Sequence, residues 1–226
     1  MINKGETYKP MKLYHEDCIK VLQSMPNESV DLVVTDPPYL MDFVSHRRKD
    51  LYAPIVGDNL GGQELISTYF NECERVLKPN TAIYCFCSWH HVDFFKQEFE
   101  KHFKLKNIII WNKNNHGSGD LRGAYAPKYE MVLYGHKGRS LFRYKRLADI
   151  MDCDKVSGSK SQHPTEKPVD LLKTFIMNNS DEGNVIFDGF MGVGSTGIAC
   201  KELRRDFIGC EIDDGYFEIA QERIND

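Results

Sequence analysis

Residues 184–200 read NVIFDGFMGVGSTGIAC, an apolar run that ends in Asp188 and continues into a glycine-rich turn. The residues after the turn have the composition of a helix, so the stretch predicts a strand, a tight turn and a helix. Three kinds of ligand site share this geometry: a dinucleotide fingerprint, a phosphate-binding P-loop and a pocket for a methyl-donor nucleotide. The residues in and around the turn separate these three.

The P-loop interpretation fails because the turn contains no cation. The spacing of Gly189 and Gly194 nearly matches that motif, but Ser195 stands where a lysine would reach the phosphates. A lipase-type nucleophile turn fails too, because Val193 occupies the position of its first glycine. A turn without any ligand is disfavoured, because glycine loses more backbone entropy on folding than any other residue.

The dinucleotide interpretation keeps its glycines, in the spacing Gly192-x-Gly194-x-x-Gly197. It also has an acid, Glu211, at the end of the next apolar run, where a carboxylate could accept hydrogen bonds from ribose hydroxyls. That acid would serve any adenosine-containing ligand. Asp188, however, would repel a pyrophosphate, whereas it suits a ligand that carries an amino group and a sulfonium charge. This favours S-adenosylmethionine (SAM).

Apolar runs alternate with helical patterns along almost the whole chain, which predicts an α/β domain whose mostly parallel sheet is covered on both faces. Strands are expected at 11–15, 30–36, 81–88, 104–113, 127–136, 184–188 and 206–212. Helices are expected at 17–25, 63–78, 91–103, 167–180, 195–203 and from 215 onward, with Pro79 ending the second. A dinucleotide-binding turn normally follows the first strand, so a turn this late in the chain predicts a permuted nucleotide-binding fold.

Composition sets broad limits on the protein. At 226 residues, 41% of them hydrophobic, the chain suits one globular domain, and its net charge of −4 neither demands nor excludes nucleic acid. Without a long apolar run or the apolar centre of a signal peptide, we expect no membrane contact and a cytoplasmic location. The scattered cysteines contain no C-x-x-C pair, so we expect no disulfide framework and no metal site, with Cys85 and Cys87 in the core.

A second motif, Asp36-Pro37-Pro38-Tyr39, follows an apolar run and therefore lies at the carboxyl end of a predicted buried strand. Ligands of open α/β sheets bind outside the carboxyl ends of the strands. Taken alone, these four residues could also form an ordinary turn capped by Asp36. The apolar strand before them and the glycine turn elsewhere in the chain favour a binding site.

The motif suits methyl transfer to an amino group of a nucleobase, a nitrogen whose lone pair is delocalised into the ring. The Asp36 carboxylate and the Pro37 carbonyl could each accept one N–H and so free that lone pair, while the two prolines stiffen the backbone that aims the carbonyl. Tyr39 offers a face on which a flipped-out base can stack. Direct displacement at the sulfonium carbon then needs no covalent enzyme intermediate.

Three blocks carry a resemblance to a known family: VVTDPPY at 33–39, HPTEKPVDLL at 163–172, and IFDGFMGVGSTGIAC at 186–200 with FIGCEID after it. In content and order they resemble the permuted β class of amino DNA methyltransferases, in which D-P-P-Y precedes the methyl-donor motif. The resemblance implies a Rossmann-like methyltransferase fold with a seven-stranded, mostly parallel sheet and one antiparallel strand. It also implies a single catalytic domain over residues 1–226.

The resemblance assigns roles to individual residues. Asp36, Pro37, Pro38 and Tyr39 would handle the target base. The SAM pocket would be formed by Asp17, His163, Thr165, Lys167, Asp188, Gly189, Phe190, Gly192, Ser195, Thr196 and Glu211. Within that set, Thr165 and Lys167 offer a hydroxyl and a cation to the carboxylate of the donor, and Asp17 would meet its adenine amino group.

The family places its target-recognition region between the strand at 127–136 and His163, which here gives a short insertion at about 137–162. Basic and aromatic residues alternate in it, as contacts to phosphates and bases would require, although a solvated basic loop has the same composition. A second basic cluster lies at 47–49. The predicted DNA contacts are therefore Arg47, Arg48, Lys49, Arg139, Arg143, Tyr144 and Arg146.

The function implied by the resemblance is a site-specific, SAM-dependent DNA methyltransferase of the restriction–modification type, acting on the N6 amino group of a flipped-out adenine. An N4-cytosine enzyme is the nearest alternative, although that class more often has serine where Asp36 stands. An RNA adenine methyltransferase shares the donor and the chemistry. Protein-glutamine methylation, a binding module without catalysis and an NAD oxidoreductase fit fewer of these residues. We expect a monomer or homodimer.

Overall fold

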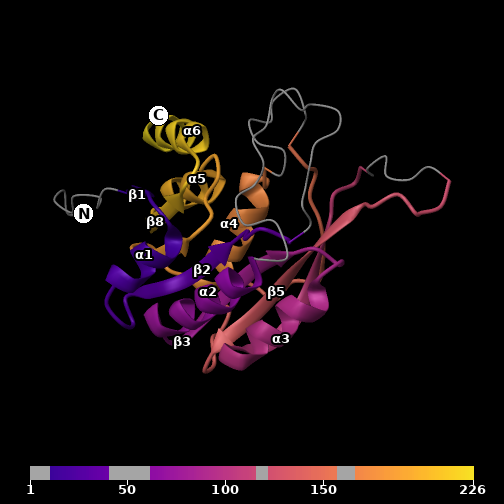
Figure 1. Ribbon diagram of the computed structural model, residues 1–226, viewed down its shortest axis with the longest axis horizontal. Coiled ribbons are helices and arrows are strands. Elements are labelled where there is room, and N and C mark those ends of the chain that lie inside the picture. The colour runs from indigo at the N-terminus through magenta and orange to yellow at the C-terminus, as the bar shows by residue number, and fades with distance from the viewer. Residues whose placement is uncertain (1–10, 41–61, 116–121, 157–165) are drawn as a thin grey trace.

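The computed structural model describes residues 11–40, 62–115, 122–156 and 166–226 (Figure 1). These residues form one eight-stranded sheet with the strand order β1-β8-β7-β2-β3-β5-β4-β6. The strands are β1 (Lys12–His15), β2 (Val30–Thr35), β3 (Leu77–Cys87), β4 (Lys104–Asn112), β5 (Tyr129–Lys137), β6 (Ile150–Asp152), β7 (Val185–Asp188) and β8 (Asp206–Glu211). All neighbouring pairs are parallel except those of β5, which runs antiparallel to β3 and β4. The predicted mostly parallel sheet with one antiparallel strand is confirmed.

The eighth strand corrects the predicted count of seven. β6 has only three residues and pairs with β4, with Ile110 opposite Ile150 and Asn112 opposite Asp152. A strand this short has no recognisable period in the sequence, and it forms because β4 offers an unpaired edge. It lies within the segment 137–162 that we predicted to be the target-recognition insertion.

Helices cover both faces of the sheet (Figure 1). In the described part of the chain they are α1 (Cys18–Ser24), α2 (Gln63–Val76), α3 (Val92–His102), α4 (Val169–Asn179), α5 (Ser195–Glu202) and α6 (Asp214–Asn225). The first three bury side chains such as Phe70 and Phe99 in one hydrophobic core, which also contains Cys85 and Cys87 as predicted. The last three bury Phe175, Ile224 and their neighbours in a second core.

The second predicted helix ends earlier than expected. α2 stops at Val76 and β3 begins directly with Leu77, so Pro79 lies inside a strand rather than at the end of a helix. A proline cannot donate a ladder hydrogen bond. It is tolerated here because it lies at an irregularity: the pairing with β2 passes from Leu77, opposite Val30, to Ala82, opposite Leu32, and the pairing with β5 starts only at Thr81.

Strands β2 and β7 are neighbours although most of the chain lies between them. They pair in parallel, with Leu32 opposite Ile186 and Val33 opposite Phe187. Their carboxyl ends therefore meet at one edge of the sheet, which we name the carboxyl edge; the opposite side is the amino edge. This is where the strand order changes direction, and ligands of such sheets bind outside this kind of edge.

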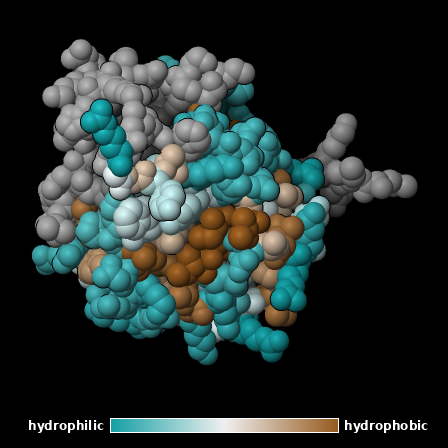
Figure 2. Space-filling model, turned by 90° about the vertical axis from the view of Figure 1, so that its right-hand side faces the viewer, coloured by the Kyte–Doolittle hydropathy of each residue, from teal (hydrophilic) through white to brown (hydrophobic). Residues whose placement is uncertain are grey.

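The surface of the molecule is mixed in character. Viewed from the right-hand side of Figure 1, it has a group of hydrophobic residues bordered by hydrophilic ones (Figure 2). Leu141 and Phe142, between β5 and β6, are exposed apolar side chains, and so is Ile150, the first residue of β6. No helix in the described part of the chain is long and apolar enough to cross a membrane.

Candidate functional site

A cavity of about 200 Å³ opens at the carboxyl edge, between the ends of β2 and β7. Both predicted motifs line it: the first through Asp36, Pro37, Pro38 and Tyr39, and the second through Asp188, Gly189, Phe190, Gly192, Ser195 and Thr196. The predicted residues Asp17, Lys167 and Glu211 line it as well. His163, Thr165, Arg47, Arg48 and Lys49 lie outside the described residues.

Asp188 ends β7 and is almost fully buried. Its Oδ1 accepts the backbone N–H of Phe190 at 3.1 Å, and its Oδ2 accepts the Thr196 hydroxyl at 2.6 Å. Burial raises the pKa of Asp188 to about 7, although these two hydrogen bonds oppose the rise. The predicted ligand residue Thr196 therefore also holds the carboxylate that stands at the mouth of the turn.

The turn depends on glycine at its last position and at its first. Gly194 precedes α5 with φ +83°, a conformation that residues with a Cβ atom rarely adopt. At Gly189, a Cβ atom would lie 2.5 Å from the ring of Tyr69. The Tyr69 hydroxyl accepts the Gly189 N–H at 3.3 Å and lies 2.8 Å from Thr35 Oγ1, so one side chain of α2 connects the ends of β7 and β2.

Glu211, at the end of β8, holds the other side of the turn. Its Oε2 accepts the N–H of Gly192 at 3.0 Å, and its Oε1 accepts those of Ile212 and Asp213 at 2.9 and 2.8 Å. Burial raises the pKa of this carboxyl group against the effect of those hydrogen bonds. Like Glu211, Asp17 both lines the cavity and accepts a backbone hydrogen bond: its Oδ1 caps α1 by accepting the Ile19 N–H at 2.7 Å.

The D-P-P-Y motif is held by its own tyrosine and by a lysine. The Tyr39 hydroxyl donates to Asp36 Oδ1 at 2.6 Å, and the Lys167 ammonium contacts Asp36 Oδ2. Lys167 is 6% exposed, and its Nζ lies 5.6 Å from the ring centroid of Tyr39 and 4.9 Å from that of Phe86. Burial raises the pKa of Asp36, and the charge of Lys167 opposes that rise.

Within the protein, Lys167 contacts the D-P-P-Y motif: its ammonium lies against Asp36 and is 3.3 Å from Glu130 Oε2. Its predicted contact with the carboxylate of a methyl donor stays a prediction, and Lys167 does line the cavity. Lys167 reaches Asp36 because the segment before α4 packs near the end of β2. No local sequence pattern predicts this contact.

Several acids near the cavity were not predicted from the sequence: Glu16, Glu166 and Asp213 line it, and Glu130 lies beside it. Glu130 lies in β5, 15% exposed, and its Oε2 accepts the Tyr39 hydroxyl at 3.1 Å. Glu166 lines the cavity and pairs with Arg223 at 2.8 Å, while Arg223 also donates to the carbonyl of Val193 at 2.8 Å. Glu130 has no motif around it, and Glu166 lies in the block 163–172 without a role that the block assigns to it, so their tertiary partners identify both.

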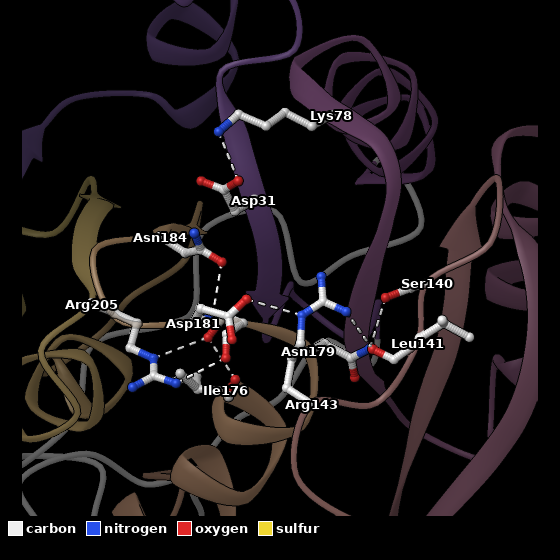
Figure 3. Close-up of polar contacts among 11 residues, drawn as sticks. Asp31, Lys78, Ser140, Leu141, Arg143, Ile176, Asn179, Asp181, Asn184 and Arg205 are labelled. Atoms are coloured by element: carbon white, nitrogen blue, oxygen red, sulfur yellow. Dashed lines mark hydrogen bonds and ion pairs between the residues drawn. The ribbon is translucent and has the colours of Figure 1, made fainter.

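Two of the basic residues predicted to contact DNA lie at the amino edge. Arg143 Nε donates to Asp181 Oδ2 at 3.0 Å, and the Asp181 N–H donates to Asn184 Oδ1 at 2.9 Å, just before β7 begins (Figure 3). The Arg139 N–H donates to Asn80 Oδ1 at 3.1 Å, near the start of β3. Both therefore stand at the end of the sheet opposite the cavity.

The antiparallel course of β5 explains this placement. It brings the chain to the amino edge, where Lys137 pairs with Thr81. The exposed Tyr144 and Arg146 follow on the stretch that returns to β6. At the carboxyl edge, directly after β3, stands instead an aromatic pair: Trp89, 53% exposed, stacks on His90 with ring centroids 3.9 Å apart.

No group of metal-ligating side chains occurs among the residues that the structure describes. All seven cysteines are free thiols, and six of them are buried. The described lining of the cavity offers a ligand carboxylates, the ammonium of Lys167, hydroxyls and backbone groups.

Comparison with known proteins gives consistent similarities. A sequence model of a family described as DNA methylase, N6 and N4, matches residues 30–222. A type II methyltransferase of Streptococcus pneumoniae, M2.DpnII, is 29% identical over 95% of this chain and 89% of its own length.

Two solved structures show how far the similarity extends in three dimensions. The complex of M1.HpyAVI with SAM superposes with a TM-score of 0.72 at 26% identity, over 96% of this chain and 100% of that one. The cytosine-N4-specific PvuII DNA methyltransferase has a TM-score of 0.77 at 18% identity, over 95% of this chain and 86% of that one. At that identity the second likeness concerns the fold alone.

Proposed function

The chain belongs to the DNA methylase family of N6 and N4 amino methyltransferases, and from that premise we propose that it methylates the N6 amino group of adenine in DNA. The observation that carries the proposal is that Asp36 and Asp188, one from each motif, line the same cavity. The choice of adenine rests on Asp36, because the cytosine-N4 class more often has serine at this position.

The methyl donor of this family is SAM, and the residues around the cavity fit it. Asp188 and Glu211 supply carboxylates for cationic and hydroxyl groups, and Ser195 Oγ is buried without a hydrogen-bond partner among the described residues. We assign the donor pocket to Asp17, Asp188, Gly189, Phe190, Gly192, Ser195, Thr196 and Glu211. His163 and Thr165 are expected there from the sequence.

The D-P-P-Y motif binds the amino group of the target base. Asp36 accepts one N–H of the amino group and the Pro37 carbonyl accepts the other, which localises the lone pair on nitrogen. When bound, SAM would supply the methyl group: the electron pair of the carbon–sulfur bond would stay on the sulfur, and the proton lost by the amino nitrogen would pass to water. Lys167 keeps a positive charge beside Asp36 and so favours the ionised carboxylate that this role needs.

Tyr39 provides the surface for a base that has left its duplex stack. Its hydroxyl is tied to Asp36 at 2.6 Å, which limits the rotation of the ring. Stacking on such a ring contributes roughly 1–3 kcal/mol, comparable to the few kcal/mol that unstacking the base costs. The base and the donor would then meet across the carboxyl edge, between the ends of β2 and β7.

The test is incubation of the protein with SAM carrying a labelled methyl group and with unmethylated DNA, followed by mass spectrometry of the nucleosides. We expect label in N6-methyladenine. Label in N4-methylcytosine would overturn the choice of adenine. Label in RNA offered in parallel, with none in DNA, would overturn the substrate class.

A further inference from the structure

Four charged side chains from four different parts of the fold meet beside the cavity, in the order Asp36, Lys167, Glu130, Lys113. Lys167 contacts Asp36 Oδ2 and lies 3.3 Å from Glu130 Oε2, while Lys113 pairs with the other oxygen of Glu130. Asp36 follows β2, Glu130 is in β5, Lys113 follows β4 and Lys167 precedes α4. Neither Glu130 nor Lys113 is among the described residues that line the cavity.

The cluster is neutral when all four groups are ionised, since two carboxylates face two ammonium groups. Their side chains are only 6–23% exposed, so an unbalanced charge there would be poorly solvated. Burial by itself raises the pKa of Glu130, but Lys167 and Lys113 outweigh it and hold that pKa below its usual value. Glu130 is thus a carboxylate that stays charged and shares the charge of Lys167 with Asp36.

The Tyr39 hydroxyl lies between the same two acids. It is 2.6 Å from Asp36 Oδ1 and 3.1 Å from Glu130 Oε2. A phenol has one proton to donate, so only one of these contacts is a full hydrogen bond at a time. When Asp36 Oδ1 accepts an N–H from a target base, Glu130 offers the phenol a second acceptor.

We propose that Glu130 and Lys113 are positioning residues for methyl transfer, which act through Lys167 and Tyr39 to set the charge and hydrogen-bonding state of Asp36. The inference rests on the proposed function, because it takes Asp36 as the acceptor for the amino group of the base. It assigns a role in the reaction to two residues outside the cavity lining and outside the D-P-P-Y motif.

Other groups that face Asp36 do not change among the variants below. Asp188 approaches from β7, and its charge opposes ionisation of Asp36. Cys85 and Cys87 approach from β3, and burial raises the pKa of both thiols, that of Cys87 to about 12, so they stay neutral. The ionisation of Asp36 is therefore changed chiefly by altering Lys167, Glu130 or Lys113.

The test is the pH dependence of kcat/KM for DNA, measured with the whole chain at saturating SAM so that the effect of Asp188 on donor binding does not contribute. Glu130→Gln leaves one excess positive charge, which favours the ionised form of Asp36. The acidic limb of the pH profile should therefore move to lower pH, by on the order of one unit. Lys113→Met leaves one excess negative charge, so the limb should move to higher pH by a similar amount. Glu130→Asp keeps the charge and should keep the wild-type limb even if kcat falls.

Matched controls come from ion pairs away from the cavity. Glu72→Gln removes a partner of Arg75, and Lys78→Met removes a partner of Asp31; neither should move the limb. If Glu130→Gln and Lys113→Met shift the limb in the same direction, or not at all, the inference is wrong. If one of them fails to fold, the sign of the other decides. Failure of the wild type to methylate DNA would count against the proposed function instead.

Discussion

Asp36 and Asp188 stand at the carboxyl ends of two adjacent parallel strands and line one cavity, although most of the chain separates them. Asp36 is held by Tyr39 and Lys167, whereas Asp188 is held by Thr196 and the backbone of Phe190. Each carboxylate opposes ionisation of the other, yet their hydrogen-bond partners are separate. The site therefore has two halves with separate hydrogen-bond networks, which a substitution can alter one at a time.

Removing the carboxylate of Asp36 should stop methyl transfer but leave SAM binding nearly unchanged. We expect Asp36→Ala to lower kcat by at least about a hundredfold, because the amino nitrogen loses an acceptor made in the transition state. SAM affinity, measured by calorimetry, should change little, because the hydrogen bonds that hold Asp188 and Glu211 do not involve Asp36. Loss of SAM binding together with transfer would contradict the division into two halves.

The second carboxylate should make donor binding depend on pH. Its pKa of about 7 means that, without a ligand, Asp188 is largely protonated below that pH and ionised above it. A cationic donor prefers the ionised form, so SAM affinity should rise from pH 6 to pH 8, by up to about tenfold per unit on the acidic side. Calorimetry at three pH values checks this, and Asp188→Asn should bind weakly without the pH dependence.

The same raised pKa predicts how stability changes with pH. The folded protein holds the Asp188 proton more tightly than the unfolded chain, whose value is 3.8. Its contribution to the free energy of unfolding should therefore be full below about pH 4 and be lost as the pH rises to about 7. Urea unfolding across this range should show a smaller decline in Asp188→Asn than in the wild type. An equal decline in both proteins would show that other groups cause it.

Substitutions at two glycines with positive φ should distinguish the stability cost of backbone strain from that of steric overlap. At Gly183, with φ +77°, a Cβ atom would have no described neighbour within 4 Å, whereas at Gly194 it would lie 2.9 Å from Ile224 Cδ1. Gly183→Ala should cost about 1–2 kcal/mol of stability, from the backbone alone. Gly194→Ala should cost more and also weaken SAM binding, because it displaces the turn beside Asp188. Equal costs in urea unfolding would contradict this explanation.

DNA binding should depend on the carboxyl edge rather than the amino edge. Trp89 is exposed directly after β3, so Trp89→Ala should raise KM for DNA by roughly tenfold if the ring stacks on a base. Arg143→Ala loses a surface ion pair with Asp181 at the amino edge and should change that KM less than about twofold. Steady-state kinetics at one fixed salt concentration compares them. The reverse ranking would support the sequence-based assignment of Arg143 to DNA contact.

Several features of the protein follow from its sequence because they are local. Alternating apolar and helical periods predict most strands and helices, and the residues after each strand identify Asp36 and Asp188 as ends of strands. The late glycine turn predicts the permuted order, and β7 indeed follows six other strands in the described chain. The sequence patterns did not predict β6, which is too short to show a period, and they placed the end of α2 too late.

What the sequence by itself determined is therefore the element order, the two motifs and the chemical character of the cavity. Only the tertiary structure decided that Lys167 contacts Asp36, that Glu130 reaches Tyr39, and that Arg139 and Arg143 stand at the amino edge. The physical reason is that periodicity records which side of a strand is buried, not which strand becomes its neighbour or in which direction it runs. The antiparallel course of β5 alone places Glu130 near the cavity and Arg139 at the far edge of the sheet.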